Sequence, residues 1–354
     1  MNDVEELKQY IGVHAKGQDI PDLEGLLARI RTDTAGPGSW AGEWTAAGDR
    51  WAERGRHLEA SRHYIMARFP YVDGAARQEA YEKSLDAFER WSADQDLHRF
   101  DVDVDGRKVG CWQSGLSEGG SRPLVVVTGG FLTVKEQWAP TLQVFRRLGL
   151  AAVATEMPGV GENEVPYDAG SWRYLSAVID AVAGQADTSR TCAVALSFSG
   201  HQALRCAMVD PRITGVITVG APVHDFFTDM AWQKGLPRIT VDTLAHLSGG
   251  ELADMADRAL SPSSLDVLEA QVGYVASLRD EVIPQADPRL LQEHVRHLHL
   301  LEHDDVHGSP GHVRETQLWL TRTLLRMQGV QGAGSLLVGL MWTMARARSR
   351  LAAR

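Results

Sequence analysis

The sequence is poor in cysteine, with only three cysteines in 354 residues. An odd and sparse set without metal-ligand spacing predicts neither a disulfide framework nor a cysteine metal site. Cys192 falls in a predicted strand and Cys206 in a predicted helix. We therefore interpret both as small core residues of a protein from a reducing compartment.

Positive charge is also scarce. Lysine and arginine together number 36 against 46 aspartate and glutamate residues, which gives a formal net charge of −10. This balance argues against a surface that binds nucleic acid. The first residues are acidic and helical in character, so no signal peptide is predicted and we expect a cytoplasmic protein.

Long apolar runs are missing as well. The strongest run, residues 336–345, has about half of the roughly 20 residues that a membrane-spanning helix needs, so we expect no integral membrane span. The run is followed by four basic residues, Arg346, Arg348, Arg350 and Arg354. The pattern predicts an amphipathic helix within 329–354 that docks on the protein or on a second subunit, with a membrane surface as the alternative.

The sequence does contain two regions of different periodicity, divided near residue 98. Residues 1–98 carry no convincing strand, and Gly55 and Ala60 lie where two helices are expected to approach closely. An amphipathic helix is indicated by apolar residues at three- and four-residue intervals, namely Tyr81, Leu85, Phe88 and Trp91. We expect a helical, cap-like N-terminal domain over 1–98.

After residue 98, short strands alternate with helices. Alternating residues on both sides of Asp105-Gly106 predict an antiparallel hairpin. Six apolar strands are expected at Leu124–Val127, Ala151–Thr155, Cys192–Leu196, Ile213–Val219, Val272–Ser277 and His297–Leu301. Helices are expected at about 137–147, 170–184, 199–209, 287–294 and 312–328. This order predicts a mostly parallel twisted sheet with helices on both faces, an α/β-hydrolase catalytic domain over 99–328.

The segment from Thr191 to Gly200 is typical of a nucleophile elbow. A buried strand runs directly into Ser197, and a helix is expected to follow. The sharp turn of such an elbow requires small residues two positions before and two after the nucleophile. Here these are Ala195 and Ser199, where the commoner pattern has glycine at both positions. Ser197 is therefore the candidate nucleophile.

The partners of Ser197 are predicted by chain order, which in this fold runs serine, acid, histidine. Asp280 follows the strand Val272–Ser277 and is the candidate acid. His307 lies in the loop after the last strand and is the candidate base, with His303 as the alternative. In such a triad the imidazole takes the proton of the serine while the buried carboxylate fixes its tautomer.

Acyl transfer also needs hydrogen-bond donors for the oxyanion that develops on the substrate. The backbone N–H of Phe198, directly after the nucleophile, is one candidate. The other is expected in the loop Thr128-Gly129-Gly130-Phe131 after the first parallel strand, from the N–H of Gly130 or Phe131. No residue pattern predicts a cofactor or a metal ion.

These motifs together resemble the FrsA-like α/β-hydrolases, the group that includes dihydroxypseudooxynicotine hydrolase. The resembling segments occur in family order, at Thr128–Glu136, Thr155–Gly161, Ala195–Gly200, Asp210–Ile213 and Arg279–Pro284. The resemblance implies a helical domain over a hydrolase sheet, the triad Ser197, Asp280 and His307, and often a homodimer. The scaffold is also similar to the esterase-like lyases of tetronate pathways, which eliminate acetate.

We expect an enzyme that cleaves an ester or an activated ketone C–C bond of a small molecule, in a tailoring role in secondary metabolism such as antibiotic biosynthesis. The first alternative is a lyase that eliminates acetate from an O-acetylated tetronate intermediate. The second is a non-catalytic binding protein on a hydrolase scaffold. The aromatic residues of segment 222–265, Phe226, Phe227 and Trp232, are expected to line the pocket or to pack in the core.

Overall fold

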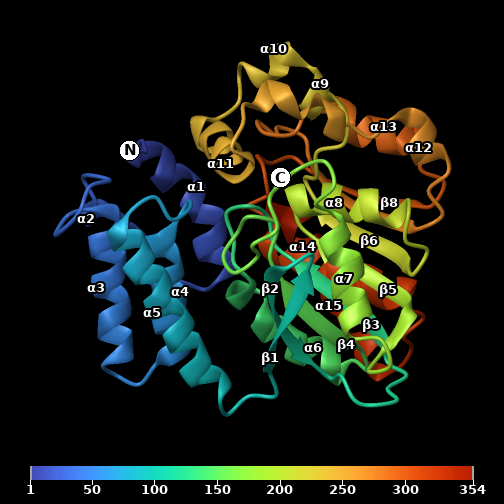
Figure 1. Ribbon diagram of the computed structural model, residues 1–354, viewed down its shortest axis with the longest axis horizontal. Helices are drawn as coiled ribbons and strands as arrows, with labels where there is room; N and C mark the ends of the chain where they lie inside the picture. The colour runs from blue at the N-terminus through green and yellow to red at the C-terminus, as the bar shows by residue number, and fades with distance from the viewer. Residues whose placement is uncertain (1, 353–354) are drawn as a thin grey trace. The chain divides into compact units, whose positions relative to one another are not determined.

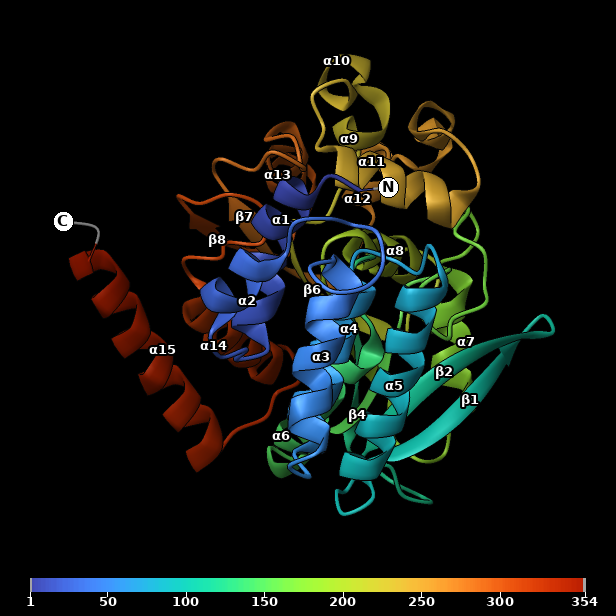
Figure 2. The same cartoon turned by 90° about the vertical axis from the view of Figure 1, so that its left-hand side faces the viewer.

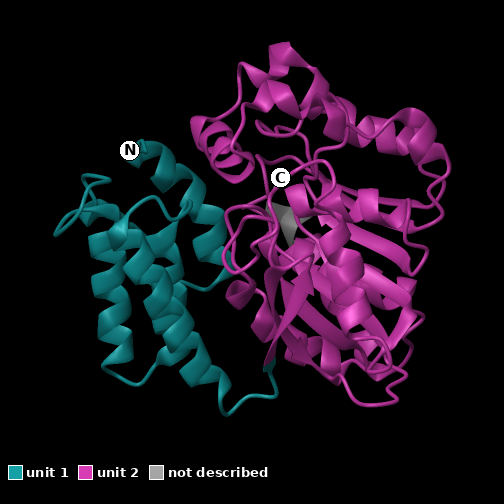
Figure 3. Cartoon of the chain, viewed as in Figure 1, with its two compact units in different colours: residues 1–98 teal, residues 99–354 magenta. Residues whose placement is uncertain are grey.

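The computed structural model describes residues 2–352, and the chain divides into two compact units, Met1–His98 and Arg99–Arg354 (Figures 1 and 3). Arg354, the last basic residue of the predicted C-terminal helix, lies outside the described residues. Taken separately, the first unit is helical and the second contains one sheet.

In the first unit, helices account for the regular structure of residues 2–97. They are α1 (Val4–Gly17), α2 (Leu23–Arg29), α3 (Trp40–Ala52), α4 (His57–Arg68) and α5 (Ala75–Ser92). Side chains cap the N-termini of two of these helices. Asp3 accepts the N–H of Glu5 at the start of α1, and Ser39 accepts the N–H of Gly42 at the start of α3. The amphipathic stripe predicted around Phe88 lies on α5.

Helices α3 and α4 approach closely at Gly48, and not at Gly55 as the sequence had indicated. Gly55 lies in the turn between them, with φ +70° and open space where a Cβ would stand. The close approach is at Gly48, where an added Cβ would come within 2.4 Å of the Tyr64 ring. Gly55 is therefore selected by turn conformation, and Gly48 by packing.

The second unit is built on an eight-stranded sheet in the order β1-β2-β4-β3-β5-β6-β7-β8. The strands are β1 (His98–Val104), β2 (Arg107–Ser114), β3 (Pro123–Thr128), β4 (Ala151–Thr155), β5 (Asp187–Ala195), β6 (Ile213–Val219), β7 (Gln271–Ser277) and β8 (Leu298–His303). Strand β2 is antiparallel to β4, and all pairs from β4 to β8 are parallel. All six residues of β3 are buried, as expected where helices cover both faces.

Helices lie between these strands from β3 onward and after the last strand, β8. They are η1 (Lys135–Gln137), α6 (Ala139–Arg147), α7 (Arg173–Ala181), α8 (Phe198–Ala207), α9 (Asp225–Thr228), α10 (Met230–Gln233), α11 (Arg238–Ser248), η2 (Leu252–Arg258), α12 (Pro262–Asp266), α13 (Ala286–His294), α14 (Val313–Met327) and α15 (Ala333–Ala352). The predicted fold class, a mostly parallel α/β-hydrolase sheet with an additional helical region, is confirmed. In Figures 1 and 2, α9 and α11 lie beyond the end of the sheet where α8 begins.

The C-terminal helix α15 follows α14 and packs along it (Figure 2). Trp342 anchors the contact, since Arg322 of α14 and Arg346 stack on its ring. Several apolar residues of α15 remain exposed, namely Leu336, Leu337, Leu340, Met341 and Met344. Among the described residues, no helix is both long enough and apolar enough to span a bilayer.

Candidate active site

The turn from β5 into α8 has the geometry of a nucleophile elbow. Ser197 adopts φ 55° and ψ −125°, a conformation that costs a non-glycine residue about 1–3 kcal/mol. Backbone hydrogen bonds to both neighbouring strands hold it there: the N–H of Leu196 donates to Thr128 O at 2.9 Å, and the N–H of Ser197 donates to Val219 O at 2.9 Å. The sheet thus holds Ser197 in its strained conformation.

The small residues after the nucleophile have separate structural roles. The Ser199 hydroxyl donates to Thr128 O at 3.0 Å and lies 2.9 Å from Leu196 O, so it links the end of β3 to the elbow. A Cβ on Gly200 would come within 2.0 Å of the Thr218 hydroxyl oxygen. Serine therefore replaces the usual glycine at 199 because its hydroxyl is used, and glycine is required one residue later.

Ser197, His307 and Asp280 come together at the carboxyl ends of the strands. The Ser197 Oγ lies 3.4 Å from Nε2 of His307. The other ring nitrogen, Nδ1, lies 3.0 Å from both carboxylate oxygens of Asp280. One of these oxygens also accepts the N–H groups of Val282 and Ile283, at 2.9 and 2.8 Å. Asp280 is thus fixed by backbone donors and places the proton of His307 on Nδ1.

Burial and charge act in opposite directions on His307. Removal from water lowers its pKa, but the Asp280 carboxylate, with a smaller contribution from Glu281, outweighs burial and leaves the pKa above 6.5. The side chain is 20% exposed, against 3% for Asp280. The imidazolium form, which appears when the ring accepts a proton, is therefore stabilised at this position.

His303, the alternative base, lies elsewhere. It is the last residue of β8 and pairs with Ser277, so strand geometry fixes its direction. Its Nε2 lies 3.1 Å from the Thr316 hydroxyl, and only 4% of the residue is exposed. Burial, and then the neighbouring His312, lower its pKa to about 4. Of the two histidines, the structure brings only His307 to Ser197.

The predicted oxyanion loop lies directly against Ser197. A Cβ on Gly130 would stand 3.2 Å from the Cβ of Ser197, so the loop backbone passes the serine at van der Waals distance. A Cβ on Gly129 would collide with the Thr133 hydroxyl at 1.9 Å. The rings of Phe131 and Phe198 are in contact, with centroids 4.6 Å apart. Phe198 begins α8, and the first N–H groups of a helix have no acceptor within the helix.

The family profile described as "Esterase FrsA-like" matches residues 37–270, about two thirds of the chain. The chain belongs to the FrsA-like esterase family. Among curated relatives, the Esterase FrsA of Vibrio cholerae is 23% identical over 285 residues, 70% of this chain and 66% of that protein. The Citrobacter koseri Esterase FrsA is 26% identical over 247 residues, 63% of this chain and 58% of that protein. The chain thus spans at most about two thirds of these relatives.

Solved structures show the same fold. The structure titled "AbyA5 Wildtype" is 45% identical, with a TM-score of 0.93, and the match covers 97% of this chain and 99% of that one. The 2,6-dihydroxy-pseudo-oxynicotine hydrolase is 18% identical, with a TM-score of 0.71 over 91% of this chain and 96% of that one. At that identity, the second likeness supports the fold only.

Two residues beside Ser197, Asp280 and His307 were not predicted. Glu281 accepts the backbone N–H of His307 at 3.0 Å. Gly220, at the end of β6 with φ +58°, leaves room for the imidazole, because a Cβ there would stand 2.9 Å from its Cε1. A glycine directly after a parallel strand is a usable sequence signal for Gly220. We find no local signal for Glu281.

Of the aromatic residues of segment 222–265, the two phenylalanines pack in the core. Phe226 and Phe227 are buried: Phe226 contacts the Phe198 ring, and Phe227 contacts the His201 ring. Trp232 is partly buried and donates its ring N–H to Val282 O at 3.0 Å. The two phenylalanines therefore belong to the core beneath the elbow.

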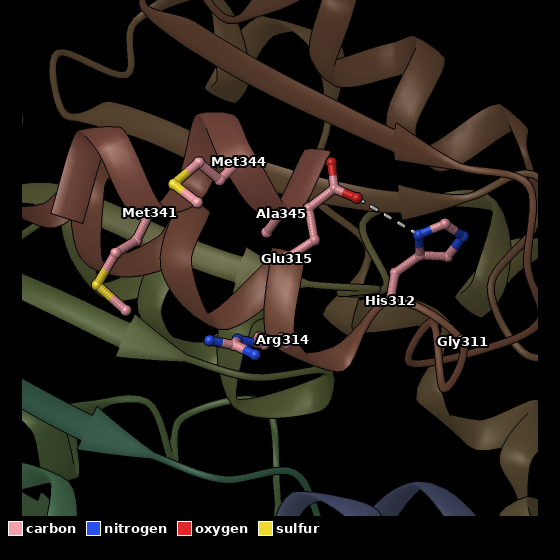
Figure 4. A pocket seen from close by; sticks show the side chains of 7 residues that line it. All are labelled: Gly311, His312, Arg314, Glu315, Met341, Met344 and Ala345. Carbon is pink, nitrogen blue, oxygen red and sulfur yellow. Dashed lines mark ion pairs between the residues drawn. The ribbon is translucent and has the colours of Figure 1, made fainter. Parts of the chain in front are cut away.

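One group in the described residues has the composition of a metal site, His303, His312 and Glu315, with one ligand atom of each within 4.8 Å of the others. Figure 4 shows His312 and Glu315 beside a pocket of about 230 Å³ between α14 and α15. The rings of His303 and His312 are stacked, with centroids 4.2 Å apart and planes within 12°. An imidazole binds a metal ion in its ring plane, and one ion cannot lie in both planes. In this arrangement the two rings cannot bind one ion together, so we describe the group as a stacked histidine pair beside the Glu315 carboxylate.

Proposed function

We propose that this protein is a serine-dependent esterase of small molecules, with Ser197 as nucleophile, His307 as base and Asp280 as the orienting acid. The observation that carries the proposal is the continuous chain of contacts from Ser197 Oγ through the imidazole to the Asp280 carboxylate, at 3.4 and 3.0 Å. The chemistry of such a chain is proton removal from the serine as it attacks a carbonyl.

The reaction divides into two steps. His307 takes the hydroxyl proton while Ser197 Oγ bonds to the substrate carbonyl carbon, and the carbonyl oxygen becomes an oxyanion. The N–H of Phe198 and that of Gly130 or Phe131 receive this oxyanion; each such donor is worth about 10²- to 10³-fold in rate. His307 then returns the proton to the departing alcohol. Water replaces the alcohol: His307 takes a proton from it as its oxygen bonds to the acyl carbon, the bond from that carbon to Ser197 Oγ breaks, and the proton passes to Oγ.

A fluorophosphonate probe tests the nucleophile. It reacts with an activated serine hydroxyl, so the wild-type protein is expected to be labelled rapidly. Ser197→Ala is expected to abolish labelling, while the matched variant Ser263→Ala, which lacks an exposed hydroxyl on α12, keeps a reactive Ser197. Equal labelling of wild type and Ser197→Ala would refute the proposal and leave the non-catalytic binding protein as the better account.

The alternative is an esterase-like lyase that eliminates acetate from an O-acetylated tetronate. The same His307 can remove a proton from carbon instead of from serine, and the same backbone donors can stabilise the resulting enolate. No water is consumed in that reaction. In heavy-oxygen water, hydrolysis through an acyl-enzyme places solvent oxygen in the released acid, whereas elimination releases acetate with its original oxygens.

A further inference from the structure

Arg258, at the end of η2, is a buried cation with few partners. Only 8% of the residue is exposed. One terminal nitrogen, Nη2, donates to Tyr167 O at 3.2 Å, and the guanidinium carbon lies 4.2 Å from the centre of the Tyr167 ring. The other two nitrogens, Nε and Nη1, are shielded from solvent and have no hydrogen-bond partner among the described residues.

Two other buried cations in this chain have carboxylates beside them. Lys135, with a fully buried side chain, lies 2.9 Å from Glu136 and 2.6 Å from Glu162. Arg77, with a side chain 5% exposed, pairs with Asp33 and with Asp73. In contrast, no carboxylate of the described residues lies within salt-bridge distance of Arg258. Arg258 therefore supplies the positive charge and the donors of an ion pair, and its surroundings do not supply the anion.

A buried guanidinium without a counter-charge is costly, because the protein interior stabilises an unpaired charge far less than water does. Arginine does not lose its proton to avoid this cost. An anionic oxygen bound to one of the free N–H groups would compensate the charge and satisfy that donor. Nε and Nη1 lie on different edges of the guanidinium, so one oxygen does not bind both.

The backbone of Arg258 contacts the helix that Ser197 precedes, α8. Its carbonyl oxygen lies 2.8 Å from Nε2 of His201 on α8. His201 follows Ser197 by four residues, about one helical turn or 6 Å along the axis. Burial lowers the pKa of His201 to about 4, so this histidine is neutral near pH 7. The local positive charge therefore comes from the arginine.

We propose that Arg258 binds a carboxylate or enolate oxygen of the substrate, so that this enzyme acts on anionic esters. The inference rests on the proposed esterase function for the position of the reacting carbonyl. It assigns Arg258 a specificity role: binding the charged end of the substrate while Ser197 attacks the ester. The substrate class is a small ester with a second, negatively charged oxygen group.

Binding is tested first without catalysis, by the thermal stability of the protein in sodium acetate against sodium chloride at equal ionic strength. A ligand that binds only the folded state raises Tm with the logarithm of its concentration. We expect acetate to raise the Tm of wild type and of Ser197→Ala, and to have no such effect on Arg258→Met. Arg238→Met, an exposed arginine on α11, is the matched control and should respond as wild type.

Turnover is tested with two 4-nitrophenyl esters of similar length, the anionic hemisuccinate and the neutral valerate. Losing a hydrogen bond to a charged group predicts that Arg258→Met lowers kcat/KM for the hemisuccinate at least about tenfold, through KM, and leaves the valerate within about threefold. Arg258→Lys keeps the charge and provides a folded comparison if the methionine variant is unstable; it should retain part of the preference.

The proposal is overturned if acetate has no effect on wild type beyond that of chloride, or if it stabilises Arg258→Met equally. Equal losses for both esters in Arg258→Met would also overturn it, since they indicate a structural role. Failure of the esterase proposal has a different signature: no turnover of either ester by wild type, with the acetate effect on Tm intact.

Discussion

His303 and His307 lie four residues apart in one segment, yet their surroundings are opposite. His303 is enclosed by β8 and α14, with the Thr316 hydroxyl and the ring of His312 as neighbours, and its pKa falls to about 4 because burial penalises the charged form. His307 is also removed from water, but it faces Asp280, which raises its pKa. At His303, burial and the neighbouring His312 outweigh the nearby Glu315 carboxylate and lower the pKa, whereas at His307 the hydrogen-bonded Asp280 carboxylate outweighs burial and raises it.

The difference arises from how the two loops are joined. The N–H of Leu278 donates to His303 O at 2.8 Å, and the N–H of Arg279 donates to Asp305 O at 3.0 Å. These bonds continue the pairing of β7 and β8 beyond the strands and carry the chain to His307 opposite Asp280. A histidine within the strand is fixed to the direction of the sheet, whereas one four residues later can turn toward Ser197.

The largest effect is expected from replacing the two histidines separately. His307→Ala should lower kcat for ester hydrolysis by about 10⁴-fold or more, as losses of a triad base do. His303→Ala should leave kcat within a few-fold, because its side chain does not contact Ser197. Steady-state kinetics with thermal unfolding of both variants separates catalysis from folding. If His303→Ala were the inactive variant, the assignment of the base would be wrong.

The next effect concerns Glu281 as a positioning residue for His307. Glu281→Ala removes the acceptor of the His307 N–H, and the displaced imidazole should lower kcat on the order of 10- to 100-fold with little change in KM. Glu281→Gln keeps an acceptor oxygen without the charge and should restore most of the rate. Arg279→Ala is the matched control, since it removes only the exposed pair with Asp304 from the same two loops. Equal rates in Glu281→Ala and wild type would show that the loop holds His307 without this bond.

A smaller effect is expected in the pH profile. The base must be neutral, so kcat/KM should fall on acidification through the pKa of His307, which is raised above 6.5. In Glu281→Gln the midpoint of this acid limb should move to lower pH, because a negative charge that favours the imidazolium is lost. Stopped-time assays across pH 5–9 measure both midpoints. A midpoint that stays in place would remove Glu281 from the electrostatics of the site.

The sequence supports the fold and the central contacts because both depend on local signals. Apolar runs between helical segments predict the strands, and small residues around Ser197 predict the elbow. The choice between His303 and His307 was open, since it depends on where β8 ends against Ser277. The lack of a carboxylate partner for Arg258 could not be predicted either, because it depends on which side chains the fold places around its guanidinium. Such features are non-local, as is the close approach at Gly48 that was expected at Gly55.

The smallest effect concerns stability, where the two histidines should have opposite signs. The pKa of His303 is about 4 in the fold against an ordinary 6.5, so the unfolded chain binds its proton first. The free energy of unfolding therefore has its full value above pH 6.5 and falls by on the order of 3 kcal/mol as the pH falls toward 4, because the unfolded chain takes up this proton and the folded protein does not. His303→Gln should therefore reduce the loss of stability on acidification.

The pKa of His307 is raised, so the contribution of this group to the free energy of unfolding is complete below pH 6.5 and is lost as the pH rises. His307→Gln should therefore make the loss of stability on acidification steeper. Urea unfolding between pH 4 and 8 measures both slopes, and equal slopes in the two variants would contradict the comparison, because burial would then act on both histidines without the carboxylate.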